Sequence, residues 1–192
     1  MSPRSTEQFE AIREKSRNKI LMAALELFAH QGYHNTSVSQ IAKKAEVAKG
    51  LVYNYFASKE ALLEGIILKG MGESQVIFEK IAATPTSKGK MEQIILITCE
   101  YLVERYDYYK LLMALSLQLD QFPQLRDMIQ ARFKSMLPFL SMLMSDLGFE
   151  DPQSEALKLG ALMDGMGLQY MVLKDAFPLE EMKAHLLKTY CK

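Results

Sequence analysis

Residues 36–59, with the sequence TSVSQIAKKAEVAKGLVYNYFASK, constrain the fold more than any other stretch of this chain. Ser37 and Gln40 have the spacing of a capping box, in which each side chain satisfies the other residue's backbone N–H at a helix start. A helix is therefore predicted to begin at Val38. The apolar residues that follow recur every three or four positions, which gives this helix one buried face.

A second helix is predicted directly after the first, over about residues 48–56. Val52 and Phe56 are four residues apart, so they lie on the same side of this helix and face the interior. The opposite side carries basic, small, aromatic and amide groups. These outward residues are Lys49, Gly50, Tyr53 and Asn54. Two short helices in this arrangement are typical of a helix–turn–helix, which places its second helix in the major groove of DNA.

About a dozen residues in this region match one known family pattern in register. They are Gly32–Tyr33, Thr36–Val38, Ile41–Ala42, Val47, Lys49–Gly50, Tyr53, Phe56 and Ser58–Leu62. On these residues the chain resembles the DNA-binding domain of the TetR family of bacterial transcriptional regulators. The resemblance covers roughly residues 13–68 at the level of motifs, and beyond them it rests on length and helical layout.

The resemblance implies an all-α protein of about nine helices. A three-helix helix–turn–helix domain would occupy residues 1–58. A helical domain for ligand binding and dimerisation would occupy residues 59–192, with the helix after Ser58 as the connector. The resemblance further implies a homodimer on a palindromic operator in double-stranded DNA, and a repressor that a small hydrophobic or amphipathic inducer releases.

The resemblance also assigns roles to individual residues of the DNA-reading helices. Contacts to backbone phosphates are expected from Ser37, Ser39, Lys49, Tyr53 and Tyr55. Lys59 is expected to anchor a further phosphate at the start of the next helix. Gly50 would allow close approach to the groove, while Leu51 and Asn54 would contact bases. Partial packing in the core remains an alternative for Tyr55.

Two residues depart from the family pattern. Ala48 stands where the family often has a serine that caps the recognition helix and contacts a phosphate. Glu46 stands in the turn where glycine is common, and it brings a negative charge towards the expected DNA surface. Both departures leave the fold intact and affect the expected affinity for DNA.

The N-terminal segment is rich in basic residues that would reach phosphates or the minor groove. A solvated start of the first helix, which is predicted over residues 13–31, explains them equally well. The basic residues are Arg4, Arg13, Lys15, Arg17 and Lys19.

The remainder of the chain shows helical periodicity interrupted by proline and glycine. Gly32 is predicted to end the first helix in a left-handed conformation, and Pro138 to kink or split a long helix. The later helices are predicted, after the N-cap Ser58, over about residues 59–82, 90–105, 110–119, 124–147, 152–174 and 179–190.

Ligand contacts are expected among polar or aromatic residues on apolar helices of the C-terminal domain. Each is also explained as a surface or structural group. The candidates are Cys99, Glu100, Tyr101, Gln118, Asp164 and Gln169.

The resemblance implies that the last long helices pair across a two-fold axis, and close approach over small residues suits that use. Burial within one protomer would explain the same composition. The interface candidates are Gly160, Met163, Gly167, Tyr170, Met171 and Leu186.

Composition describes an ordinary globular protein, with 49% hydrophobic and 24% charged residues. No apolar run reaches membrane-spanning length and no signal-peptide segment is visible, so we expect a cytoplasmic protein without a membrane partner. The net charge is zero, but residues 1–60 hold nine Lys or Arg against six Asp or Glu. A modestly basic N-terminal part suits contact with phosphate at one end only.

The sequence contains no catalytic constellation, so we do not expect an enzyme. Its three histidines are scattered, and Cys99 and Cys191 fit no metal spacing and are expected to stay reduced. No metal or cofactor is expected. A second hypothesis is a DNA-binding regulator whose C-terminal domain binds a protein partner. A cavity lined by Met and Tyr would favour the small ligand, and a filled domain with an exposed apolar patch would favour the protein partner.

Overall fold

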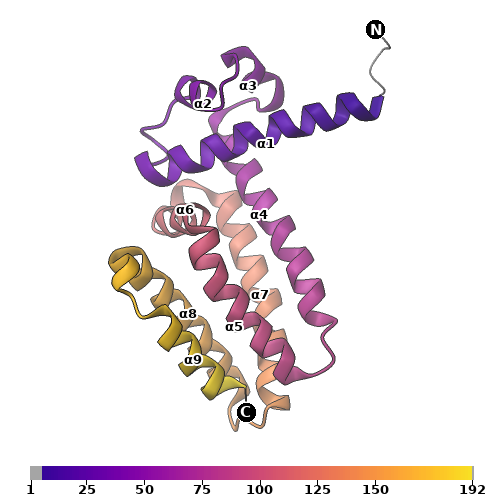
Figure 1. The fold of residues 1–192 in the computed structure, drawn as a ribbon, viewed down its shortest axis with the longest axis vertical. Coiled ribbons are helices and arrows are strands. Elements are labelled where there is room, and N and C mark those ends of the chain that lie inside the picture. The colour runs from indigo at the N-terminus through magenta and orange to yellow at the C-terminus, as the bar shows by residue number, and fades with distance from the viewer. Residues whose placement is uncertain (1–5, 192) are drawn as a thin grey trace. The chain divides into compact units, whose positions relative to one another are not determined.

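The computed structural model of the protein describes residues 6–191, which form nine α-helices and two short 3₁₀-helices without any strand (Figure 1). The expected all-α fold is thus confirmed. Arg4, one of the basic residues named above, lies outside the described residues. The α-helices are α1 (Thr6–Gln31), α2 (Val38–Lys44), α3 (Lys49–Tyr55), α4 (Lys59–Ala82), α5 (Ser87–Glu104), α6 (Tyr106–Ser116), α7 (Pro123–Asp146), α8 (Pro152–Leu173) and α9 (Leu179–Tyr190).

The chain forms two compact units, residues 1–73 and 74–192, with the boundary inside α4. The sequence had suggested a boundary at residues 58 and 59. The first unit extends further because the beginning of α4 is part of its core, where Leu62 and Ile66 are buried. A Cβ atom added to Gly65 would lie 3.1 Å from side-chain atoms of both Leu21 and Phe56.

The first unit begins with α1, which starts at Thr6 rather than near residue 13 as expected. Gly32 ends this helix with φ +84° and donates its N–H to the Phe28 carbonyl oxygen at 3.0 Å. This left-handed conformation is the one predicted at a helix C-terminus, and glycine adopts it without a steric penalty. The chain then turns into α2 and α3, which lie beside each other and against α1 (Figure 1).

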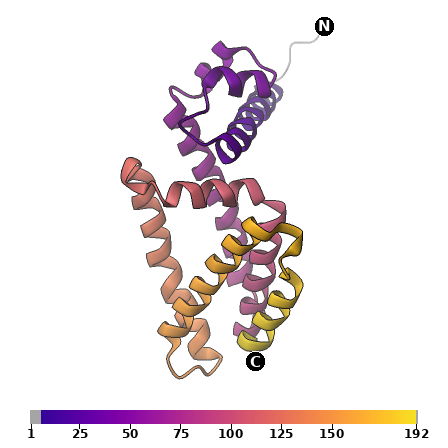
Figure 2. The ribbon, with the colours of Figure 1, turned by 90° about the vertical axis from the view of Figure 1, so that its left-hand side faces the viewer.

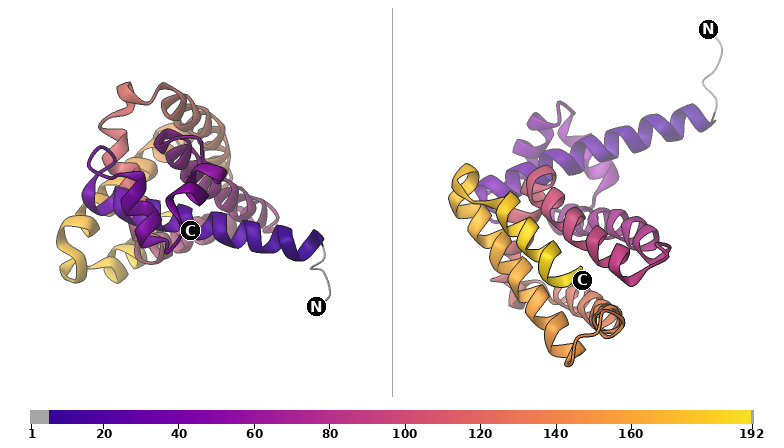
Figure 3. Two further views of the ribbon diagram at one scale, coloured as in Figure 1. Left: turned by 90° about the horizontal axis from the view of Figure 1, so that it is seen from above. Right: turned by 60° about the horizontal axis from the view of Figure 1, so that its bottom comes forward.

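The second unit is a layered bundle of residues 74–82 of α4 and the helices α5–α9. α5 lies between α4 and α9 (Figures 1 and 3), and α8 packs along α7 and runs obliquely towards α9 (Figure 2). A core shared by α5, α7, α8 and α9 holds these helices together. Its fully buried side chains include Met91, Ile95, Leu143, Met144, Leu159 and Leu186.

The structure differs from two expectations about this unit. α7 passes through Pro138 as one helix, so the split that was one of the two predicted outcomes does not occur. Proline removes one helical N–H, but here it lies on the exposed side, while Leu143 and Met144 on the other side are buried and hold the helix in place. In addition, α6 begins at Tyr106 rather than near residue 110, so the aromatic run of this segment is its first turn.

α6 and α8 approach each other closely at one glycine. A Cβ atom added to Gly167 would overlap the hydroxyl and ring of Tyr109, so only glycine fits beneath this side chain. The Tyr109 hydroxyl lies 3.5 Å from the backbone oxygen of Asp164. Burial, together with the negative charge of Asp164, raises the pKa of Tyr109 to about 12. Tyr109 is therefore a neutral phenol seated on the backbone of α8.

Among residues 6–191, no helix combines the length and the apolar character needed to cross a membrane.

We expect Gly167→Ala to lower the free energy of unfolding by about 1–3 kcal/mol, because the new methyl group must displace the Tyr109 ring. Gly72→Ala is the matched control. It adds the same methyl group to a helix at a position where nothing lies within 4 Å. It should raise the free energy of unfolding by about 0.5–1 kcal/mol, through helix propensity alone. Denaturant unfolding of both variants measures the contrast, and equal effects would contradict the close approach of α6 and α8.

Candidate functional site

The start of α2 is fixed by the predicted capping box. The backbone N–H of Ser37 donates to Gln40 Oε1 at 2.7 Å, and the backbone N–H of Gln40 donates to Ser37 Oγ at 3.2 Å. The Ser37 hydroxyl also lies 2.8 Å from Gln40 Oε1, so this side chain is used to form the helix. Ser39, by contrast, is exposed in the first turn of α2.

α3 is attached to the first unit through a narrow buried face. Val52 is fully buried and Phe56, at the C-cap, is 5% exposed. The outward side chains Lys49, Tyr53 and Asn54 are exposed. α3 therefore presents to solvent the face expected to contact DNA.

The surface of α3 around Gly50 is open. A Cβ atom added to Gly50 would meet nothing within 4 Å, so internal packing does not explain the glycine. Lys49 Nζ lies 6.0 Å from the centre of the Tyr53 ring, and Tyr53 is 49% exposed. The side of α3 around Gly50 is thus open, with one cation and one aromatic ring beside the opening.

Tyr55 and Leu51 differ from their exposed neighbours because both are half-buried. The Arg13 guanidinium carbon lies 5.9 Å from the centre of the Tyr55 ring, and that ring contacts Phe56 at 6.5 Å between centroids. Tyr55 is therefore partly packed in the unit, as the alternative interpretation of this residue proposed. Arg17 lies similarly over Phe56, at 5.4 Å.

The turn between α2 and α3 combines backbone strain with a charge pair. Glu46 has φ 51°, a left-handed conformation that is costly for residues other than glycine. Its carboxylate accepts a hydrogen bond from Lys19 Nζ at 2.7 Å, and Lys19 lowers the pKa of Glu46. The negative charge in the turn is therefore paired with a lysine of α1. Ala48, at the N-cap of α3, makes no side-chain capping bond.

Lys59 has a structural use that the sequence did not reveal. Its ammonium group donates to the backbone oxygens of Tyr33 and Thr36 at 2.9 and 3.1 Å, with the oxygen of His34 at 3.4 Å. It also lies 4.4 Å from the centre of the Tyr33 ring. Since an ammonium group has three donors, these contacts occupy it fully. The expected phosphate anchor is instead a tie between α4 and the loop that follows α1.

Tyr33 completes this tie. Its hydroxyl donates to Glu60 Oε1 at 2.9 Å, and its ring packs on Phe28 at 5.1 Å between centroids. Burial and the neighbouring Glu60 carboxylate raise the pKa of Tyr33. Ser58 Oγ accepts the backbone N–H of Ala61 at 3.2 Å, which confirms its predicted capping of α4. The start of α4 is therefore bonded firmly to the end of α1.

The second unit contains a cavity of about 250 Å³ between α4, α5, α6 and α7. Of the six candidate ligand contacts, only Tyr101 lines it. Among the described residues, the lining is Ser74, Ile77, Phe78, Ile81, Ile94, Ile97, Thr98, Tyr101, Leu102, Tyr109, Arg132, Met136, Phe139 and Leu140. It is apolar, as expected, but isoleucine and phenylalanine dominate and a single methionine contributes.

The other five candidates have different positions. Cys99 is buried in the helical core, one residue from the cavity-lining Thr98. Gln118 is half-buried and donates from Nε2 to the Ala114 oxygen at 3.2 Å. Glu100, Asp164 and Gln169 are exposed, outside the cavity lining. The missed residues follow helical spacing on α7, where Arg132, Met136, Phe139 and Leu140 share one face.

The interface candidates divide into two groups. Gly167 lies under Tyr109 and Leu186 is fully buried, so neither is available to a second protomer in this conformation. The correction follows from packing, because α6 and the helical core cover these positions. The remaining candidates are half-buried, and they are Gly160, Met163, Tyr170 and Met171.

We expect Lys59→Met to lower the free energy of unfolding by about 1.5–3 kcal/mol, because several backbone oxygens lose a charged donor. Lys49→Met is the matched control. It removes the same charge from an exposed position on α3 and should change stability by less than about 0.5 kcal/mol. Thermal or denaturant unfolding compares the two variants. Similar stabilities would show that Lys59 does not tie α4 to the loop.

Comparison with known proteins relates both units to one group of regulators. Residues 20–66 match the family model described as bacterial regulatory proteins of the tetR family. The transcriptional regulator UidR of Escherichia coli K12 is 28% identical over 166 residues, which cover 84% of this chain and 82% of UidR.

Two solved structures share the fold. A transcriptional regulator from Saccharomonospora viridis, crystallised with choline, has a TM-score of 0.76 and 20% identity, covering 90% of this chain and 94% of its own. FadR from Bacillus subtilis, crystallised with stearoyl-CoA, has a TM-score of 0.70 and 24% identity, covering 91% of this chain and 97% of its own.

The matched helix–turn–helix, the relation to UidR along most of the chain and the shared helical fold lead to one conclusion. Residues 20–66 carry the DNA-binding domain of the TetR family of bacterial transcriptional regulators, and the chain along most of its length is similar to regulators with that domain.

Proposed function

We propose that this regulator is a homodimeric repressor that binds a palindromic operator and is released by a small ligand. The observation that carries the proposal is the exposed face of α3, with Lys49, Tyr53 and Asn54 directed to solvent around the open side of Gly50. In such a dimer, two copies of α3 enter successive major grooves about 34–36 Å apart. Selection of bound duplexes from a random pool tests this directly, because a dimeric reader enriches inverted repeats.

An apolar stripe on α8 supports the homodimer. Leu157, Ala161, Leu168 and Val172 are all exposed, and their spacing of four, seven and four residues places them on one side of the helix. Val172 is 75% exposed and Leu168 is 55% exposed. The exposed Asp164 interrupts this stripe between Ala161 and Leu168. An exposed apolar stripe of this kind is costly in water and is typical of a surface that pairs with another protein surface. We assign the stripe to a second copy of this chain.

The cavity in the second unit supports control by a small ligand. Its lining is apolar with a few polar groups, as in many ligand pockets. The choline and stearoyl-CoA bound to the two structural relatives show that this fold accommodates small molecules of different chemistry. A ligand releases DNA only when it binds the non-operator form more tightly, and such coupling energies are typically about 1–3 kcal/mol.

The alternative is a regulator without a small ligand, whose second unit binds a protein partner through the α8 stripe. The two hypotheses differ in the use of the stripe and of the cavity. A chain that is monomeric at low concentration and indifferent to cavity-filling compounds would favour the protein partner.

We expect Lys49→Ala to weaken binding to all DNA sequences and to reduce the slope of log K against log salt by about 1, because one phosphate contact is lost. Asn54→Ala is the comparison variant. It should change the preferred bases and leave the salt slope unchanged, since an amide carries no charge. Binding titrations at several salt concentrations separate the two effects. A changed base preference with an unaltered slope for Lys49→Ala would contradict its phosphate role.

Glu46→Gly and Glu46→Gln are expected to separate backbone strain from charge. Both remove a negative charge from the turn and free Lys19, so both should bind operator DNA more tightly and with a steeper salt slope. Only glycine relieves the left-handed backbone, so Glu46→Gly should be the more stable of the two. Unfolding and DNA titration of both variants provide the measurement. Equal free energies of unfolding for the two variants would contradict the claim that the backbone at Glu46 is strained.

We expect Leu168→Asp to shift the protein from dimer to monomer in analytical ultracentrifugation, because a carboxylate would be buried in the proposed interface. Val103→Asp is the control, since Val103 is 52% exposed on α5 and lies outside the stripe. The control should leave both the dimer and the helical circular dichroism unchanged. A Leu168→Asp protein that remains dimeric would place the interface elsewhere.

A further inference from the structure

The two ends of the cavity in the second unit differ in chemistry. The course of the surrounding helices shows which lining residues lie at each end. Phe78 of α4 contacts Phe139 of α7, with 4.9 Å between the ring centroids. These two residues therefore lie at the same height along the cavity and serve as a reference point for the others. α4 and α5 are joined by the short connection 83–86. Ile81 and Ile94, which flank this connection, therefore lie at the end of the cavity nearest to it.

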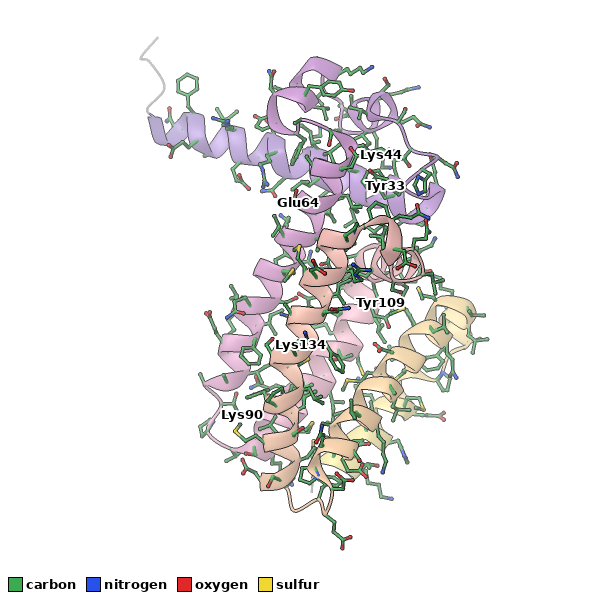
Figure 4. All side chains as sticks on the ribbon, turned by 180° about the vertical axis from the view of Figure 1, so that it is seen from behind. Tyr33, Lys44, Glu64, Lys90, Tyr109 and Lys134 are labelled. Atoms are coloured by element: carbon green, nitrogen blue, oxygen red, sulfur yellow. The ribbon has the colours of Figure 1, made fainter. Side chains whose placement is uncertain are left out.

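The polar lining residues are found towards the opposite end. Ser74 precedes Phe78 by one turn of α4, and Arg132 precedes Phe139 by two turns of α7. On α5, Tyr101 follows Ile94 by two turns, away from the connection. Tyr109 comes from α6, which continues beyond the far end of α5 (Figure 4). The cavity is thus apolar near the connection and polar at its far end.

Among the described residues that line the cavity, Arg132 is the only one with a charged side chain. Its side chain is half-buried, and among the side chains that the structure describes it forms no ion pair. No carboxylate belongs to the lining as far as the structure describes it. A guanidinium beside an apolar wall loses part of its hydration. The attraction of a partner with the opposite charge compensates for this loss. Arginine also matches carboxylate and phosphate groups through paired hydrogen bonds.

Other polar groups at this end are donors or are already bonded. The Thr98 hydroxyl donates to the Ile94 oxygen at 2.7 Å. Burial keeps the Tyr109 phenol neutral, and its raised pKa opposes formation of a phenolate. Asp164, which acts on Tyr109, is outside the described lining, so Arg132 supplies the charge nearest to a bound head group and disfavours a cation there.

We propose that the cavity binds an amphipathic anion, with a carboxylate or phosphate head at Arg132 and an aliphatic tail along the apolar end. The tail would pack against Phe78, Ile94 and Phe139, where each buried methylene contributes about 0.8 kcal/mol. The proposal names the chemical class of the effector and rests on the proposed function only for its consequence on DNA. Arg132 is then the residue that determines selectivity for charge.

The test measures binding by calorimetry to the full chain without DNA. The probes share one tail and differ in the head, namely decanoate, decyl phosphate, 1-decanol and decyltrimethylammonium. We expect both anions to bind, with Arg132→Gln weakening them by about tenfold or more and leaving 1-decanol unchanged. Lys134→Gln is the matched control, because Lys134 is exposed on the same helix, outside the cavity lining, and loses the same charge (Figure 4). Circular dichroism establishes that both variants are folded.

Equal binding of decanoate to Arg132→Gln and to the unaltered chain would overturn the proposal. So would tighter binding of the alcohol or the cation than of either anion, or no binding of any probe. The two anions distinguish a carboxylate from a phosphate ligand. A separate DNA titration distinguishes this inference from the proposed function. Decanoate that binds at Arg132 without releasing DNA would support the site and contradict ligand control, whereas release by 1-decanol alone would do the reverse.

Discussion

The burial of two side chains, Val52 and Phe56, is the interaction on which the surface proposed to read DNA depends. A helix of seven residues is not stable in water by itself, because nucleation costs more than so few hydrogen bonds return. Each of these buried side chains contributes about 1.5–3 kcal/mol, which is enough to hold so short a helix against the unit. Phe56 in turn packs against the backbone of α4 at Gly65. The orientation of α3 is thus set by its hydrophobic side, and the exposed side follows.

Several lysines around this surface are engaged in contacts within the protein. Lys59 is engaged with backbone oxygens, and Lys19 is paired with Glu46. Lys44 is paired with Glu26. The basic excess of the N-terminal part therefore overstates the cationic charge available to phosphate, and Lys49 stands out because its neighbours on α3 carry no opposing charge.

Local signals in the sequence predicted local structure well. The capping box at Ser37, the left-handed Gly32 and the bounds of α9 depend on contacts within a few residues, so spacing alone reveals them. The use of Lys59 and the partner of Gly167 depend on residues 23 or more positions away, which no local pattern indicates. Most of the residues that line the cavity were missed for a related reason. Polarity drew attention to Glu100 and Gln169, whereas the lining is set by which helix faces meet.

The narrow attachment of α3 has a consequence for how this regulator evolves. Because its outward residues take no part in the hydrophobic interior, substitutions there leave the fold nearly untouched, and under the proposed function they would alter which bases are read. Sequence preference and thermodynamic robustness are therefore separable traits in this chain. A duplicated gene can acquire a new set of target promoters through a handful of surface changes, without passing through an unfolded intermediate form.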